Sequence, residues 1–250
     1  MAIYLRQFDT HADYEAAESN LILPNVSVCV DQPTVVHYNP IAPPSYDYVE
    51  LAGIKWATKN VGANSVTDYG LYFQWGDTQG YTASQVGSGE GQKYFGWTDY
   101  KYCDGTSSVM TKYNESDGLT TLQSTDDAVT AAWGGNWRMP TASELQTLVD
   151  AVDGGSVMSA WTNDYQGSGV SGVTFTDVND SSNVLFFPAA GYCDYGNVSS
   201  VGNYGYYWSS TNDTNCGGNM AHRIQLYNDY IDFNASDRYF GYSIRGILDE

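Results

Sequence analysis

Residues 189–247 carry the densest collection of side chains that could contact a ligand. Nine of them are tyrosines, most of the others are Asn, Asp, Ser or Gly, and Lys and Glu are absent. A Tyr ring supplies a large contact area at low entropic cost, whereas Asn, Ser and Gly adapt their hydrogen bonds to different partners. This composition favours a non-covalent binding surface, although the strands and turns of an ordinary β domain use the same residue types.

Covalent and metal chemistry have weaker signals. The histidines and cysteines form neither a CxxC pair nor a zinc-ligand spacing, so we expect free thiols; these residues are His11, His37, His222, Cys29, Cys103, Cys193 and Cys216. The run from Asn228 to Asp232 offers oxygen ligands for calcium, but alternating strand positions are more often solvated. We therefore predict no metal and no other cofactor. Paired carboxylates for glycoside hydrolysis stay an open alternative because spatial separation decides that chemistry; the candidates are Asp213, Asp229 and Asp232.

Composition and charge narrow the classes of partner. The chain has 250 residues, 29 of them acidic and 10 basic, and a formal net charge of −19. This charge repels phosphate backbones, so we expect no nucleic-acid partner. No stretch is long and apolar enough to span a bilayer, which predicts no membrane insertion. The N-terminal residues lack the apolar core of a secretory signal, so we expect folding in the cytosol and, for action outside a cell, release within an assembled virion.

Two helices must be positioned in the middle of the chain. The clearer one begins at the T-x-x-E capping box of Thr141 and Glu144 and has one apolar face, made of Leu145, Leu148, Val149 and Val152. Asp126 and Asp127 favour a shorter helix over residues 126–133. Strand signals precede and follow these helices, and this order predicts an α+β fold.

The strand signals have a regular alternation. Residues 48–62 predict two strands around Gly53, residues 68–78 predict a third, and residues 170–191 predict a hairpin about the turn at 179–183. In residues 221–233 the inward side chains are expected to be Ile224, Leu226, Ile231 and Phe233. The amino-acid composition of the chain changes at Tyr46. This change predicts a ligand-binding domain in residues 46–250. Residues 1–45 would be an attachment or oligomerisation segment, or simply an added strand.

Several phrases resemble a known family. They are YVELAGIKWATKNVGANSVTDYGLYFQWGDT, WGGNWRMPTASELQTLV, YYWSST and GYSIRGI, and they are similar to the Fibrobacter-type major paralogous domain of gut Bacteroidetes. That domain resembles the formylglycine-generating-enzyme branch of the C-type lectin fold. The resemblance implies a C-type lectin-like domain with two helices and short antiparallel strands.

The C-terminal segment also resembles the variable region of proteins diversified by retroelements. Such systems mutate adenines, so that Asn codons become Asp, Tyr, Ser, Thr, Gly, His, Cys or Ala codons, and the composition of residues 189–247 fits that output. The start of the chain, MAIYLRQFDTHADYEAAESNLILPNVSVCV, looks like the start of Bacteroides phage tail proteins.

Together the resemblances imply a phage tail receptor-binding protein, located in the virion and most plausibly a homotrimer. Its partners would be a bacterial surface protein or glycan and, through residues 1–45, other tail proteins. A fixed-specificity adhesin on the bacterial cell surface is the alternative. An oxidase of the formylglycine-generating type, which relies on a cysteine pair, is the least favoured reading. Cys193 and Cys216 lack a basic neighbour that would activate a thiolate, so we expect no enzyme activity.

The resemblance also implies roles for single residues. Framework positions would include Trp208, Ser209, Ser210, Ser243, Ile244 and Arg245. Ligand-facing positions would be Tyr192, Asp194, Tyr195, Tyr204, Tyr206, Asn212, Asp213, Asn215, Tyr227, Asn228, Asp229, Tyr230, Asp232, Ser236, Asp237 and Tyr239.

Overall fold

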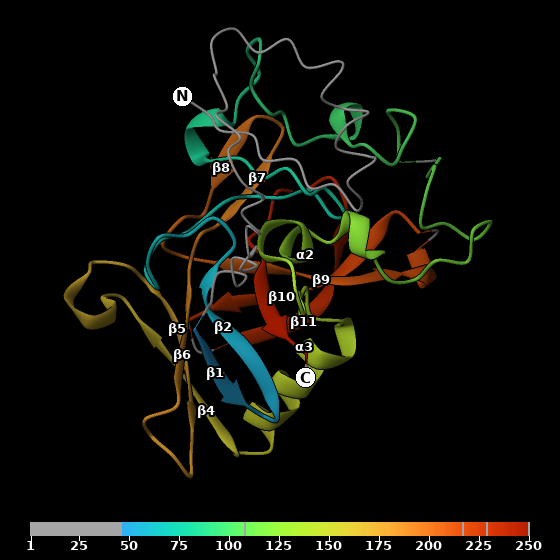
Figure 1. Ribbon diagram of the computed structural model, residues 1–250. Helices are drawn as coiled ribbons and strands as arrows, with labels where there is room; N and C mark the ends of the chain where they lie inside the picture. Colours follow the sequence, from blue (N-terminus) through green and yellow to red (C-terminus); the bar gives the residue numbers. More distant parts are fainter. Residues whose placement is uncertain (1–46, 108, 217, 229, 250) are drawn as a thin grey trace, which may run out of the picture. The chain divides into compact units, whose positions relative to one another are not determined.

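The structure is a computed structural model that describes residues 47–107, 109–216, 218–228 and 230–249 (Figure 1). The attachment segment expected in residues 1–45 lies outside the described residues, so its role stays a prediction. No helix in the described part of the chain is long and apolar enough to cross a membrane.

A four-stranded antiparallel sheet joins the first and last described strands. Its order is β1-β2-β12-β3, with β1 at Tyr48–Leu51, β2 at Ile54–Asn60, β12 at Arg245–Leu248 and β3 at Trp137–Arg138. Strands β1 and β2 pair with Leu51 opposite Ile54. The two strands predicted around Gly53 are therefore confirmed.

The other sheets are smaller and also antiparallel. The β4-β5-β6 sheet contains Val157–Thr162, Gly172–Asp177 and Val184–Pro188. Its β5–β6 pair confirms the hairpin predicted about the turn at 179–183. A two-stranded hairpin consists of β7, Tyr192–Asp194, and β8, Asn197–Ser199. The last sheet has the order β11-β10-β9, with β9 at Gly205–Asp213, β10 at Met220–Tyr227 and β11 at Tyr230–Asp237.

Both predicted helices are confirmed, although the first begins at Ala128 rather than at residue 126, and the capping box predicted for the second is present. Helix α2 spans Ala128–Trp133, and the Asp127 carboxylate accepts hydrogen bonds from the first-turn amides. Helix α3 spans Ala142–Asp153, and Thr141 and Glu144 form the predicted capping box. Gly154 follows its last turn.

The predicted fold class is wrong. Strands make up 39% of the structure and helical residues 16%, so the fold is mostly β rather than an α+β, C-type lectin-like one. Both helices exist, but α2 has only six residues and α3 only twelve. The strands form four small sheets. The strand expected in residues 68–78 is also wrong. Tyr72 and Phe73 each make only an isolated bridge, because their two partners, Tyr81 and Tyr242, lie on different segments.

Strand β9 separates two hydrophobic clusters. Successive side chains of a strand point to opposite faces, and Tyr207 packs with Trp56, Phe187 and Ile224 in one cluster. The next residue, Trp208, packs with Trp75 in the other. The framework prediction for 208–210 is confirmed, since all three side chains are buried. Ser243, Ile244 and Arg245 are buried as well.

The long loop between β2 and α2 is fixed to the C-terminal segment by Arg238. This arginine is fully buried, and its guanidinium lies 4.5 Å from the Trp75 ring centre. It donates hydrogen bonds to the carbonyl oxygens of Tyr113 at 2.6 Å, Lys112 at 3.2 Å and Met220 at 3.3 Å. One side chain thus links the loop, through Lys112 and Tyr113, to β10 at Met220.

A second polar centre in the same loop is the carboxylate of Asp126. It accepts hydrogen bonds from the Tyr113 hydroxyl and from the Lys112 ammonium group, both at 2.6 Å, and lies 3.5 Å from the Lys101 ammonium. Burial alone would raise the pKa of this carboxyl. The hydrogen bonds from Lys112, Tyr102 and Tyr113 outweigh burial and lower the pKa to about 2.

Replacing Asp126 with Asn is expected to lower the free energy of unfolding by about 2 kcal/mol at pH 7. Because the folded-state pKa lies below the ordinary value of 3.8, the stabilisation is complete above about pH 4 and is lost as the pH falls toward 2. Urea unfolding of both proteins at pH 7 and pH 3 checks this. Asp153→Asn, at an exposed position, serves as the control with an effect within about 0.5 kcal/mol. An Asp126→Asn deficit of equal size at both pH values would contradict the argument.

Candidate ligand-binding face

The β9–β10–β11 sheet has one face toward the core and one toward the tyrosines. Ile224 pairs with Phe233 and Leu226 with Ile231, and all four pack in the cluster around α3. The inward positions predicted for this segment are therefore confirmed. Paired strand residues share a face, so the other face carries Gln225 opposite Asp232 and Tyr227 opposite Tyr230.

An uninterrupted series of aromatic rings begins on this second face. We call it the aromatic row, and its members in order are Tyr227, Tyr204, Tyr206, Tyr192, Phe240, Tyr239, Tyr195 and Tyr94. The ring centres of successive members lie between 4.5 and 6.0 Å apart. Tyr206 also stacks on Tyr242, which contacts Trp208 in the core. The row is thus anchored on buried aromatic residues.

The exposed rings lie at one end of the row and one place before the other end, where Tyr94 is half-buried. Tyr227 is 44% exposed and Tyr195 is 47% exposed, and Tyr230, opposite Tyr227 in the hairpin, is 62% exposed. Tyr192, Tyr204 and Tyr206 are half-buried. The ligand-facing role expected of these tyrosines stays a prediction.

Tyr239 departs from its predicted role. Only 5% of it is exposed, because its ring is packed among Trp97, Tyr195 and Phe240. Burial, with a hydrogen bond to Tyr195, raises the pKa of its hydroxyl. Tyr239 is therefore a buried member of the row, packed against its neighbours rather than facing a ligand.

Asn212 and Asp213 are also buried, at 4% and 8% exposure, which corrects their predicted ligand-facing role. The loop before α2 covers the end of β9, where Thr121 forms a bridge with Thr211. The Asn212 amide nitrogen donates to the carbonyl oxygens of Tyr113 and Leu119. The Asp213 carboxylate accepts from the Asn215 amide at 2.9 Å. Both side chains satisfy backbone groups instead of remaining available to a ligand.

Arg223 organises the polar part of the second face. This buried side chain donates to the Asp232 carboxylate at 2.6 Å and to the Ser236 hydroxyl at 3.2 Å. Its guanidinium carbon lies 5.7 Å from the Tyr206 ring centre. Asp232 and Ser236, predicted as ligand contacts, are therefore partners of Arg223 and lie beside the aromatic row.

The remaining predicted positions differ in exposure. Asn215 and Asn228 are exposed, whereas Asp194 and Asp237 are half-buried. Burial raises the pKa of both half-buried carboxyls. Asp229 lies outside the described residues.

The far end of the row is completed by a residue that sequence reasoning missed. The β7–β8 turn packs on the loop that contains Tyr94 and Phe95 (Figure 1), where the Tyr195 and Gly196 amides donate to the carbonyl oxygens of Phe95 and Tyr94. Tyr94 and Tyr195 meet edge to face at 5.7 Å. The only sequence signal for Tyr94 is the Tyr- and Gly-rich composition of its loop. Phe240 lies within the C-terminal segment but lacks the polar group by which the other positions were chosen.

The described groups suited to covalent chemistry include two cysteines. Cys193 is fully buried, and burial raises the pKa of its thiol, so it is a weak nucleophile at neutral pH. The half-buried Cys103 thiol donates to the Trp97 carbonyl at 3.0 Å. Both thiols are free, as predicted. Among the residues that the structure describes, no group of three or more His, Cys, Asp or Glu side chains could hold a metal ion.

Residues 165–246 match a family described as a domain of unknown function, DUF8237. The matched segment begins before β5 and ends in β12, and it contains every member of the aromatic row except Tyr94. No curated protein and no solved structure matches the chain.

Proposed function

We propose that this chain binds a ligand on a bacterial surface through the aromatic row, as the receptor-binding protein of a phage tail. The observation that carries the proposal is the row itself. Tyrosines scattered through the C-terminal segment come together as one series, with exposed rings at one end and next to the other, and a buried aromatic support.

The chemistry of such a surface is recognition without a reaction. Tyr rings contribute buried area, and Asn and Asp beside them contribute hydrogen bonds. A rigid support reduces the entropy lost on binding, and the packing of Tyr206 on Tyr242 and of Tyr239 on Trp97 provides that rigidity. Several copies on a symmetric tail, a trimer in the simplest arrangement, would strengthen a weak single site.

Retroelement diversification is part of the same proposal. Residues of the adenine-mutated type occupy exposed positions at Tyr195, Asn215, Tyr227, Asn228 and Tyr230. Substitution at such positions leaves the core packing unchanged. The buried Asn212, Asp213 and Tyr239 are expected to stay fixed in spite of their residue type.

Adding the fluorescently labelled chain to a panel of bacterial strains tests the proposal. We expect saturable attachment to a subset of strains, and sequencing of the segment for residues 189–247 across natural populations should show substitutions concentrated at the exposed positions. Failure of the chain to attach to any of the strains would refute the receptor-binding role. Attachment with an invariant segment would instead indicate a fixed-specificity adhesin.

A further inference from the structure

One end of the aromatic row is bound to a carboxylate that is not itself part of the row. Asp99 lies at the end of the short 3₁₀ helix Trp97–Asp99, directly after the loop that contains Tyr94. Its Oδ2 atom accepts hydrogen bonds from the Tyr94 amide at 3.0 Å and the Phe95 amide at 3.1 Å. Its Oδ1 atom accepts from the Gly96 amide at 2.8 Å. Three successive backbone amides therefore converge on one side chain.

Two further donors complete the surroundings of this carboxylate. The Lys93 ammonium nitrogen lies 3.3 Å from Oδ2, and the Gln74 amide nitrogen donates to Oδ1 at 3.2 Å. The same nitrogen donates to the carbonyl oxygen of Tyr239, a member of the row, at 3.1 Å. Burial raises the pKa of the Asp99 carboxyl, but the backbone hydrogen bonds and the charge of Lys93 outweigh burial and hold the pKa below its ordinary value. Asp99 is therefore an anion at neutral pH, the state that can accept from all of these donors.

The loop needs support because Phe95 has a left-handed backbone. Its φ is 55°, a conformation that costs a bulky residue free energy and persists only where surrounding contacts hold it. The Phe95 ring is fully buried in one hydrophobic cluster with Cys193 of β7. The hydrogen bonds to Asp99 and the packing of this ring together fix the loop against β7.

The β7–β8 turn is held by the same peptide groups that bind Asp99. The Gly196 amide donates to the Tyr94 carbonyl, and the Tyr195 amide donates to the Phe95 carbonyl at 3.1 Å. Each of these two peptide groups thus bonds to Asp99 through its N–H and to the turn through its C=O. Hydrogen bonds connected in this way polarise and strengthen one another. The rings of Tyr94 and Tyr195 meet beside them, with centres 5.7 Å apart.

We propose that Asp99 is a positioning residue of the ligand-binding face, which sets Tyr94 and Tyr195 in place through these two peptide groups. The inference rests on the proposed function, because it concerns the same aromatic row. Tyr94 and Asp99 both lie outside residues 189–247, so diversification of that segment would leave this support unchanged. The competing account is that Asp99 stabilises only its own loop.

Amide hydrogen exchange of the full chain, followed by NMR, tests the positioning without any ligand. Asp99→Asn is expected to speed exchange of the Tyr195 and Gly196 amides at least about tenfold, because their acceptor peptide groups lose an anionic partner. Exchange of the amides in β10 should stay at the wild-type rate, which shows that the variant is folded. Unchanged exchange at Tyr195 and Gly196 would overturn the proposal, since the turn would then be held without Asp99.

Attachment to the strains that bind the wild-type chain tests the consequence for recognition. Asp99→Asn is expected to weaken attachment about tenfold, the loss expected for one displaced anchor. In a chain that already carries Tyr94→Ala and Tyr195→Ala, the same substitution should change attachment less than about twofold, because the rings that it positions are absent. An equal loss in both backgrounds would assign Asp99 a role in general stability only and would overturn the proposal.

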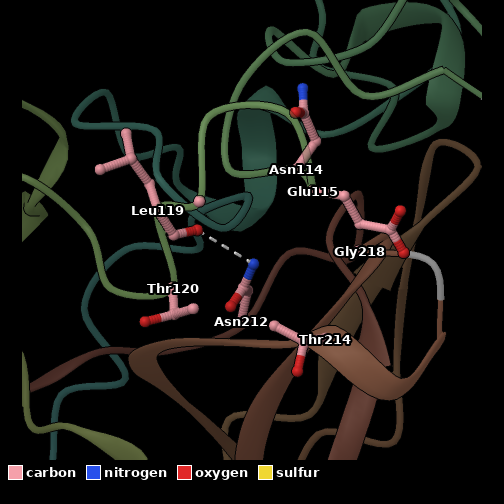
Figure 2. Close-up of a pocket in the computed structure, with 8 residues that line it drawn as sticks. Asn114, Glu115, Leu119, Thr120, Asn212, Thr214 and Gly218 are labelled. Atoms are coloured by element: carbon pink, nitrogen blue, oxygen red, sulfur yellow. Dashed lines mark hydrogen bonds between the residues drawn. The ribbon is translucent and has the colours of Figure 1, made fainter.

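Two variants control for the lost carboxylate. Asp126→Asn removes a carboxylate that is likewise hydrogen-bonded within the loop before α2, and it should leave attachment and the exchange at Tyr195 unchanged. Glu115→Gln removes an exposed charge beside the cavity at the end of β9, whose lining contains no member of the aromatic row (Figure 2). Equal loss of attachment in Glu115→Gln and Asp99→Asn would indicate an effect of net charge and would overturn the proposal. If the wild-type chain attaches to no strain, the proposed function fails, and the exchange rates alone decide whether Asp99 positions the turn.

Discussion

Replacing Arg245 with Met is expected to lower the free energy of unfolding by about 3 kcal/mol or more. Arg245 is fully buried, and no ion pair between described residues involves it. It donates to the Ala57 carbonyl at 2.8 Å, the Phe186 carbonyl at 2.9 Å and the Asn60 side-chain oxygen at 3.0 Å. These bonds connect β12 to β2 and β6, and the substitution removes the guanidinium donor from all three acceptors.

The charge of Arg245 does not reverse this expectation. Burial lowers its pKa to about 10, although interaction with Tyr207 opposes the shift, so the side chain stays charged at neutral pH. Removing a buried charge recovers part of its desolvation penalty. The recovered desolvation free energy is expected to be smaller than the free energy lost with the three hydrogen bonds. The substitution also removes the contact between the guanidinium and the Phe187 ring, whose centre lies 4.5 Å away. Lysine would not replace it, since an ammonium group cannot reach three acceptors on two strands from one position.

Urea unfolding monitored by Trp fluorescence measures the effect. The control is Arg138→Met, because Arg138 pairs with Glu144 and Asp249 on a half-exposed surface. Exposed ion pairs contribute little, so this control is expected to cost about 1 kcal/mol or less. Equal losses in the two variants would show that the buried hydrogen bonds of Arg245 are not what stabilises this junction.

The second large effect concerns binding. Replacing Tyr195, Tyr227 and Tyr230 together with Ala is expected to reduce attachment to bacteria at least about 100-fold, since each anchor of this kind contributes roughly 1–2 kcal/mol. All three rings are more than 40% exposed, so the variant should keep the wild-type unfolding free energy within about 1 kcal/mol. Tyr239 is left out because it is buried, and its loss would disturb folding.

A matched control replaces Tyr48, Met158 and Val178 with Ala. These side chains are equally exposed, but they belong to the β1-β2-β12-β3 sheet and the β4-β5-β6 sheet with its turn. Attachment should be unchanged in the control. Loss of attachment in both variants would indicate non-specific adhesion, and full attachment by the folded tyrosine variant would exclude the aromatic row as the binding face.

Local structure was predictable wherever one short segment contains all the determinants. The capping box at Thr141 and Glu144 lies within a single turn, and it fixes the start of α3. The alternation in residues 221–233 identifies the inward side chains, because the pleat has a period of two whatever lies above or below the sheet. The fold class was not predictable in this way, because it depends on how much of the chain each element occupies and on which strands pair.

Composition alone shows that tyrosines and small polar residues are concentrated in residues 189–247, and the family resemblance implied that Trp208 and Arg245 belong to the framework. Tertiary structure alone decided which of those polar residues face outward. Asn212 and Tyr227 are of equally suitable types, but the loop around Tyr113 covers the first and nothing in the described chain buries the second. Tyr94 joins the row because a distant loop packs on the β7–β8 turn. Burial is a property of contacts between segments far apart in the sequence, so residue type and spacing within one segment do not determine it.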